Sequence, residues 1–146
     1  MDKLFSGGSF VNVKYYLGLN AFTGLLTALT PFLLFPVCSQ AKPDGSHMAC
    51  YYSGVIIMLL GIVIVLSSLA SLLSSRFIMT SLSVSAICAM LCWLIPNGSI
   101  PVSGVGLCGN MEHACRAVTM PKAGIFAALI VAISLAGSVI NFVKRG

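Results

Sequence analysis

Residues 51–73 read YYSGVIIMLLGIVIVLSSLASLL and contain no charged side chain. A helix over this stretch rises about 34 Å, which is enough to cross a bilayer whose hydrocarbon core is about 30 Å thick. Three other uncharged stretches have a similar length, at residues 15–37, 77–95 and 123–143. The sequence therefore predicts four membrane-spanning helices.

The composition of the whole chain excludes an ordinary soluble domain. The 146 residues are 58% hydrophobic and 8% charged, with a mean hydropathy of +1.04, whereas soluble domains contain about 45–50% apolar and about 25% charged residues. We expect a single all-α transmembrane domain over residues 1–146, an integral four-helix bundle with outer loops at about 38–50 and 96–122. No basic stripe with interleaved aromatic residues accompanies the net charge of +5, so we expect lipid and not nucleic acid as a partner.

The distribution of lysine and arginine predicts that both termini are cytoplasmic. With that orientation the inside holds five basic residues and the outside three, which agrees with the positive-inside rule: Lys3, Lys14, Arg76, Lys144 and Arg145 against Lys42, Arg116 and Lys122. The first apolar run is longer than the 7–15 residues typical of a signal peptide, so we expect it to be retained as a helix.

The two outer loops resemble each other. The first begins at Cys38 and ends with His47-Met48-Ala49-Cys50, and the second begins at Cys108 and contains Met111 and His113 before Ala114-Cys115. This correspondence suggests the hypothesis that the chain consists of two repeated helix–loop–helix units.

The four loop cysteines are interpreted first as two disulfides. The predicted orientation places them outside the cytoplasm, where disulfides persist. Four cysteines allow three connectivities, and pairing within each loop, Cys38 with Cys50 and Cys108 with Cys115, is the most economical. Each bridge would hold a loop against two helix ends and contribute about 2–4 kcal/mol. No cofactor is expected if these cysteines are disulfide-bonded.

A metal-binding or thiol-redox protein remains the alternative. Thiolate, imidazole and thioether groups suit copper, zinc or iron, and the candidate ligands are Cys38, His47, Met48, Cys50, Cys108, Met111, His113 and Cys115. The layout resembles that of DsbB-type disulfide-generating proteins, but their closely spaced Cys-x-x-Cys pair is missing, which argues against oxidase activity. Because the only acidic residues are Asp2, Asp44 and Glu112, hydrolytic catalysis is not expected and the chain is interpreted as non-catalytic.

Small and polar residues within the spans predict helix packing. Gly124, Ala128, Ala132 and Ala136 recur every four residues and are expected to let another helix approach closely. In the third span, Ser81, Ser85, Cys88 and Cys92 share one face.

The first span has a polar side that contains Asn20, Thr23, Thr27 and Pro31. Two interpretations are open for it, hydrogen bonding within the bundle or contact with a path or partner subunit, and Pro31 predicts a local kink.

A family resemblance covers nearly the whole chain. The four-span layout, the Met48-Ala49-Cys50 run, and the run Leu-Cys-Gly-Asn-Met…Ala-Cys-Arg-x-Val-Thr-x-Pro at residues 107–121 resemble an uncharacterised bacterial family of small four-span membrane proteins with a cysteine pair in each outer loop. Members of that family tend to accompany ABC transporters with MacB/FtsX-like permeases. The resemblance implies an accessory subunit in the cytoplasmic membrane, serving an ABC-type transporter or a metal-handling system, and implies no functional residues.

Overall fold

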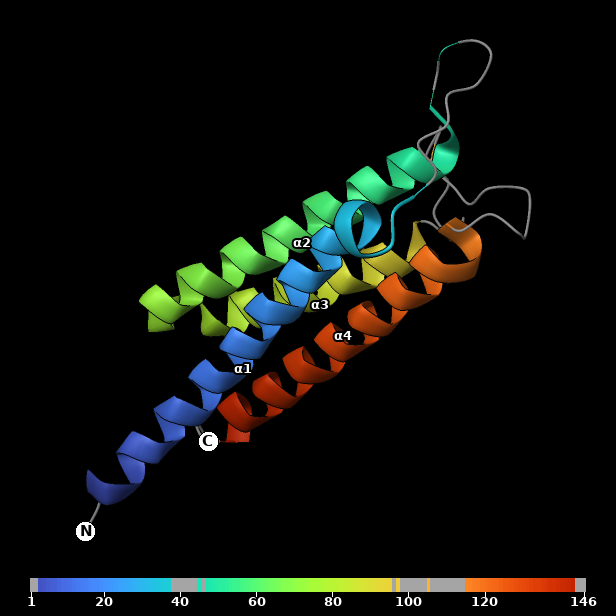
Figure 1. Ribbon diagram of the computed structural model, residues 1–146. Coiled ribbons are helices and arrows are strands. Elements are labelled where there is room, and N and C mark those ends of the chain that lie inside the picture. Colours follow the sequence, from blue (N-terminus) through green and yellow to red (C-terminus); the bar gives the residue numbers. More distant parts are fainter. Residues whose placement is uncertain are drawn as a thin grey trace.

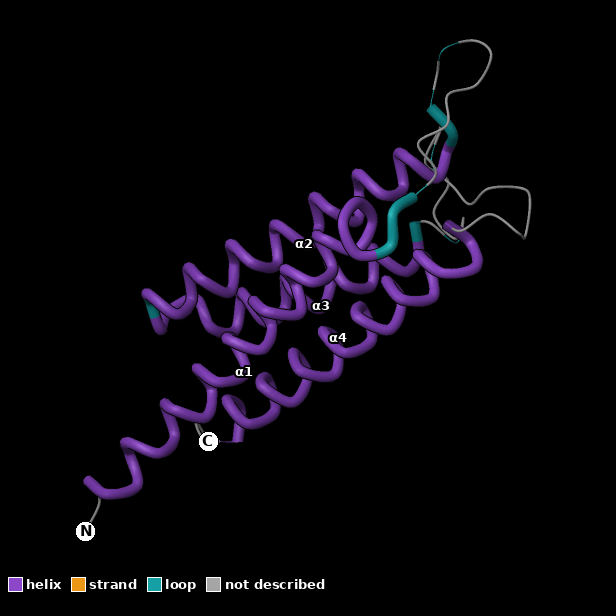
Figure 2. The backbone as a smooth tube through the Cα atoms, viewed as in Figure 1, coloured by secondary structure: helices purple, strands orange, loops and turns teal. Residues whose placement is uncertain are grey.

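The computed structural model describes residues 3–37, 45, 47–95, 97, 105 and 115–143. Every element in these ranges is helical (Figures 1 and 2), so the all-α prediction is confirmed. The four helices are α1 (Lys3–Leu29), α2 (Ala49–Leu73), α3 (Ile78–Leu94) and α4 (Met120–Val143). Short turns of other helix types adjoin them: π-helical turns at Thr30–Leu34 and Cys115–Thr119, and a 3-10 turn at Ser75–Phe77.

The helices form an antiparallel four-helix bundle. Each packs against its neighbour in chain order, α4 also packs against α1, and the diagonal pair α1 and α3 hardly touches. The beginning of α1, the α2–α3 connection and the end of α4 share one end of the bundle (Figure 1). We call the opposite end, where Phe35, His47 and Lys122 lie, the loop end.

Three stretches of helix are long and apolar enough to cross a membrane: Val13–Leu34, Ala49–Leu73 and Arg116–Val143. Helix α3 has 17 residues, and together with the preceding 3-10 turn it rises about 31 Å, close to the thickness of a hydrocarbon core. These apolar helices make the chain a multi-pass membrane protein. Helix α1 begins well before residue 15, and helical structure precedes α4 from Cys115, because a helix continues to satisfy its own backbone beyond the apolar core.

Each helix buries a face whose residues alternate between spacings of three and four. On α2 this face contains Gly54, Ile57, Gly61, Ile64 and Ser68. Corresponding series occur on α3 from Ile78 to Cys92 and on α4 from Ala123 to Asn141. An average spacing of 3.5 residues is typical of left-handed bundles with crossing angles of about 20°. The outward faces carry large apolar side chains such as Leu66 and Leu135, as expected for surfaces that contact lipid.

Glycines set the separation of α1 and α2. A Cβ atom added to Gly61 would lie 2.7 Å from the backbone nitrogen of Ala28, and one added to Gly24 would lie 2.8 Å from the Cγ2 atom of Ile64. Since real Cβ atoms do not approach other atoms this closely, a side chain at Gly61 would require the backbones of α1 and α2 to move apart, and one at Gly24 would require the Ile64 side chain to shift. Close backbone approach through small residues stabilises helix pairs in membranes by van der Waals packing.

Candidate functional site: a polar layer in the bundle and an aromatic cluster at its loop end

One polar side chain from each helix lies in the same layer of the bundle. The four residues are Asn20 on α1, Ser68 on α2, Ser85 on α3 and Ser134 on α4, all almost completely buried. An apolar cluster lies on either side of these four residues. The cluster toward the loop end consists of Ile64, Cys88, Ala89, Cys92, Ala127 and Ile130. The cluster toward the opposite end consists of Val13, Leu17, Ile78 and Leu82. We call the four residues the polar layer.

The neighbours of these residues in sequence place all four at the same level of the bundle, between the two apolar clusters. Ser68 follows Ile64 by one turn of α2, and Ser134 follows Ile130 by one turn of α4. Ser85 lies between Leu82 and Ala89, which belong to the two different clusters. Asn20 occupies the matching position on α1, and its side chain reaches α4 directly.

Hydrogen bonding in the polar layer is incomplete among the described residues. The Asn20 Nδ2 atom donates to Ser134 Oγ over 2.9 Å, which joins α1 to α4. Asn20 Oδ1, Ser68 Oγ and Ser85 Oγ have no hydrogen-bond partner in the described part of the chain. The hydrogen bond from Asn20 to Ser134 favours one alignment of α1 and α4. Each buried polar atom without a partner lowers the free energy of unfolding by about 1–3 kcal/mol, so the layer as a whole reduces stability.

The polar side of α1 is used inside the bundle. Thr23, Thr27 and Thr30 are buried, and each hydroxyl donates to a carbonyl one turn earlier on the same helix, over 2.7–2.8 Å. These bonds satisfy the hydroxyls locally. Together with the bond from Asn20 to Ser134, they place hydrogen bonds of this polar side within the bundle, while its role toward a path or a partner subunit stays a prediction.

Pro31 coincides with the predicted change in helix geometry. The α-helical pattern ends at Leu29, and Thr30–Leu34 continue as a π-helical turn that runs at an angle to α1 in Figure 1. Proline lacks an N–H group and cannot continue the α-helical bonding pattern. The backbone N–H of Val37 donates to the Pro31 carbonyl over 2.9 Å, which fixes the end of the turn.

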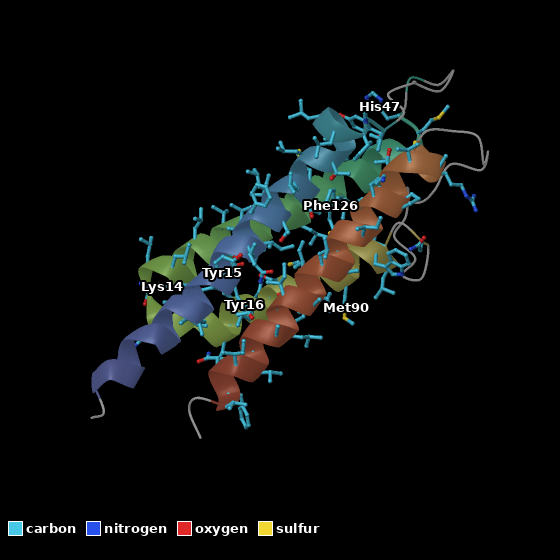
Figure 3. The ribbon with its side chains drawn as sticks, turned by 60° about the horizontal axis from the view of Figure 1, so that its bottom comes forward. Lys14, Tyr15, Tyr16, His47, Met90 and Phe126 are labelled. Atoms are coloured by element: carbon cyan, nitrogen blue, oxygen red, sulfur yellow. The ribbon has the colours of Figure 1, made fainter. Side chains whose placement is uncertain are left out.

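Aromatic rings gather at the loop end beside α2. The ring of His47 stacks on that of Tyr51 with centroids 4.3 Å apart and planes inclined by 24°. Phe32 and Tyr52 both meet the Tyr51 ring edge-on, at 5.8 and 5.9 Å. We call Phe32, His47, Tyr51 and Tyr52 the ring cluster. Figure 3 shows His47 at this end of the bundle, whereas Lys14, Tyr15 and Tyr16 lie toward the other end.

A second set of contacts at the loop end joins α4 to the end of the first helical segment. Thr119 Oγ1 donates to the carbonyl oxygen of Phe35 over 2.9 Å. The Lys122 ammonium lies 6.0 Å from the centroid of the Phe35 ring, at the limit of a cation–π interaction. These two contacts join Phe35 to the beginning of α4.

Among the predicted disulfide and metal residues, the structure describes the side chains of three. Cys50 is fully buried and packs with Val37, Met48 and Tyr51, while His47 is exposed. Cys38, Cys108, Met111 and His113, and the side chain of Cys115, lie outside the described residues. Both disulfides and the metal set therefore stay predictions. In the described ranges, no group of three His, Cys, Asp or Glu residues is arranged as metal ligands.

The predicted small-residue stripe on α4 does not follow one face of the bundle. Gly124 is buried beneath the Trp93 ring of α3, whereas Ala128 and Ala132 are exposed and Ala136 is half-buried. A spacing of four residues rotates by about 40° at each step around a helix of 3.6 residues per turn. The residues of α4 that face the bundle instead include Ala127, Ser134 and Gly137. Packing of the stripe against a further helix stays a prediction.

Comparison with known proteins supplies a family and no activity. Residues 20–140 match the model of a family described as a domain of unknown function, DUF4418. No curated protein and no solved structure matches the chain. The matched region begins at Asn20 and contains the polar layer and the ring cluster. Because it covers well over half of the sequence, the chain belongs to the DUF4418 family.

Proposed function

We propose that this chain is a non-catalytic accessory subunit of a larger complex in the bacterial cytoplasmic membrane, with both termini in the cytoplasm and the loop end outside. The ring cluster is the observation that carries this proposal, since it forms the surface that binds a partner protein. The class of partner, an ABC-type transporter or a metal-handling system, is what the family resemblance of the sequence implies.

The ring cluster has the properties of a protein-binding surface. His47 and Tyr52 are exposed, while Tyr51 is held between its neighbours. Aromatic side chains are enriched in protein interfaces, and rings already packed against one another lose little conformational freedom when a partner binds. The cluster therefore offers a rigid apolar surface with a polar imidazole at its edge.

The charges of the described residues support a role without catalysis. Lys14, His47, Arg76, Arg116 and Lys122 are exposed or half-buried, and no Asp, Glu, Lys, Arg or His is buried in the part of the bundle that the structure describes. Ionisable groups inside a membrane are typical of proton relays and ion pathways. The interior instead uses neutral amide and hydroxyl groups, which suit helix alignment.

The outer disulfides complete the proposal. Cys38 with Cys50 and Cys108 with Cys115 would fix each loop to two helix ends and so hold the partner-binding surface in one shape. In the alternative, a metal-binding or thiol-redox function, the same cysteines act with His47, Met48, Met111 and His113. The burial of Cys50 and the stacking of His47 on Tyr51 favour the structural role, because both side chains already have packing partners.

Affinity purification of the tagged full chain from its native membrane tests the proposal. In mild detergent we expect a membrane subunit to co-purify in a fixed ratio, and His47→Ala or Tyr51→Ala to remove most of it. Tyr15→Ala is the matched control, since Tyr15 is an exposed tyrosine in edge-on contact with Tyr16 at the other end. Equal recovery with all three variants would overturn the proposal, and loss of bound metal from His47→Ala would favour the alternative.

A further inference from the structure

Two buried cysteines on α3 belong neither to the polar layer nor to the ring cluster. Cys88 and Cys92 are 8% and 4% exposed, and both are free thiols. Because they are four residues apart, they lie on the same face of α3 with their Cβ atoms about 5–6 Å apart. A disulfide requires Cβ atoms that are about 3.5–4.5 Å apart. The helix therefore keeps the two sulfur atoms as separate thiols on one side of α3.

A cavity between the end of α3 and the beginning of α4 adds a third sulfur atom. Its volume is about 310 Å³, and its lining includes Cys92 and Met120, the first residue of α4. Trp93 and Asn97 also line it, and Asn97 Nδ2 donates to the carbonyl oxygen of Trp93 over 2.8 Å. The thiol of one helix and the thioether of the neighbouring helix therefore share one space.

The donor atoms around this cavity suit a soft metal ion. Thiolate and thioether ligands select Cu(I), whereas structural zinc sites use four ligands. Among the described residues this region offers the sulfur atoms of Cys88, Cys92 and Met120. Arg116 also lines the cavity, but a guanidinium has no lone pair for a metal. Since Cu(I) is satisfied by two or three sulfur atoms, the donor set fits this ion.

The surroundings of the two cysteines favour a site without net charge. Cys88 and Cys92 pack in the apolar cluster with Ile64, Ala127 and Ile130, where an uncompensated charge would be costly. Cu(I) bound to one thiolate and one neutral thioether carries no net charge. Binding breaks the S–H bond of Cys92, releases its proton to solvent and forms bonds from copper to sulfur. No group is oxidised or reduced.

We propose that this cavity binds one Cu(I) ion through the Cys92 thiolate and the Met120 sulfur, with Cys88 as a third sulfur one turn deeper on α3. None of these residues belongs to the loop ligands of the alternative function, and the site leaves the predicted loop disulfides intact. This inference does not depend on the partner protein proposed above.

Competition for Cu(I) between the full chain in detergent and the chelator bicinchoninate, in the absence of oxygen, tests the proposal. We expect the chain to retain one Cu(I) ion. The fluorescence of Trp93, the single tryptophan of the sequence, should fall on binding because this ring lines the cavity. Cys92→Ser should weaken binding at least about 100-fold, since even residues that only orient metal ligands contribute about 10–100-fold. Cys88→Ser and Met120→Leu should each weaken it about tenfold.

Met90→Leu and His47→Ala are the matched controls. Met90 is an exposed methionine of α3 that does not line the cavity, and His47 belongs to the loop ligands. Both variants should bind Cu(I) as the native chain does, and circular dichroism should show every variant to be helical; where Cys92→Ser is not, Cys92→Ala takes its place.

Three results of this competition would overturn the proposal: no Cu(I) retained by the native chain, equal retention by Cys92→Ser, or unchanged Trp93 fluorescence at saturating Cu(I). Loss of Cu(I) from His47→Ala would also overturn it, because the copper would then lie at the loop ligands of the alternative function.

Discussion

Serine-to-alanine substitutions in the polar layer are expected to change stability in opposite directions, although the chemical change is identical. Ser134 Oγ accepts the hydrogen bond from Asn20 Nδ2, so Ser134→Ala leaves the amide without its one partner in the layer. Hydrogen bonds between transmembrane helices contribute about 0.6 kcal/mol on average and about 1.7 kcal/mol at most. Including the cost of the orphaned amide, Ser134→Ala should lower the free energy of unfolding by about 1–2 kcal/mol.

The hydroxyls of Ser68 and Ser85 present the opposite case. Both are buried and have no hydrogen-bond partner among the described residues. Their removal relieves the desolvation of an unpaired group, and alanine is also a better helix former than serine by up to about 0.5 kcal/mol. Ser68→Ala and Ser85→Ala should each raise the free energy of unfolding by about 0.5–1 kcal/mol.

Reversible unfolding in mixed micelles, followed by far-ultraviolet circular dichroism during titration with dodecyl sulfate, measures these changes. Ser83→Ala is the control, because Ser83 lies on the exposed side of α3 and should change stability by no more than about 0.5 kcal/mol. The reasoning is refuted if Ser68→Ala and Ser85→Ala destabilise the protein as much as Ser134→Ala does. That result would mean that both hydroxyls are fully bonded.

Two further predictions concern packing and the loop end. Gly61→Ala should destabilise the bundle by about 1–3 kcal/mol, because the added Cβ atom meets the Ala28 backbone. Gly18→Ala should stabilise it by up to about 1 kcal/mol, because no atom lies within 4 Å of the added Cβ atom. Unfolding titrations that show equal effects of the two substitutions would contradict the packing of α1 on α2. Thr119→Val should lower the free energy of unfolding by about 1 kcal/mol, because it removes the hydrogen bond to the Phe35 carbonyl. An unchanged unfolding midpoint would show that this hydrogen bond does not stabilise the loop end.

The fold could be predicted because charge is so sparse. Four uncharged stretches, separated by segments that contain the basic residues Lys42, Arg76 and Lys122, leave few alternatives to a helical bundle in a membrane. The side chains that line the interior were harder to identify, because large apolar residues occur on both the buried and the exposed faces of these helices. On α2, for example, Ile62 is exposed and Ile64 is buried, and hydrophobicity does not distinguish them.

A different signal marks the buried faces, namely small and weakly polar residues that alternate between spacings of three and four. Gly54, Gly61 and Ser68 on α2 follow this rule, and it leads directly to the close approach at Gly61 and to the polar layer. The stripe on α4 that begins at Gly124 uses a fixed spacing of four and therefore rotates out of the buried face, so that Gly124 is buried and Ala128 is exposed. No pattern in the sequence marks the ring cluster, because Phe32 and Tyr51 come together only when the first helical segment packs against α2.

The central claim, that the loop end is a disulfide-fixed surface for a partner and not a metal or redox centre, is tested most directly by counting thiols. Denatured protein purified without reductant is labelled with a maleimide mass tag, before and after reduction. We predict two labels before reduction, at Cys88 and Cys92, which are unpaired in the bundle, and six after it, the full cysteine content. Six labels without reductant, with four of them protected in the native protein until a chelator is added, would contradict the claim and identify a bound metal.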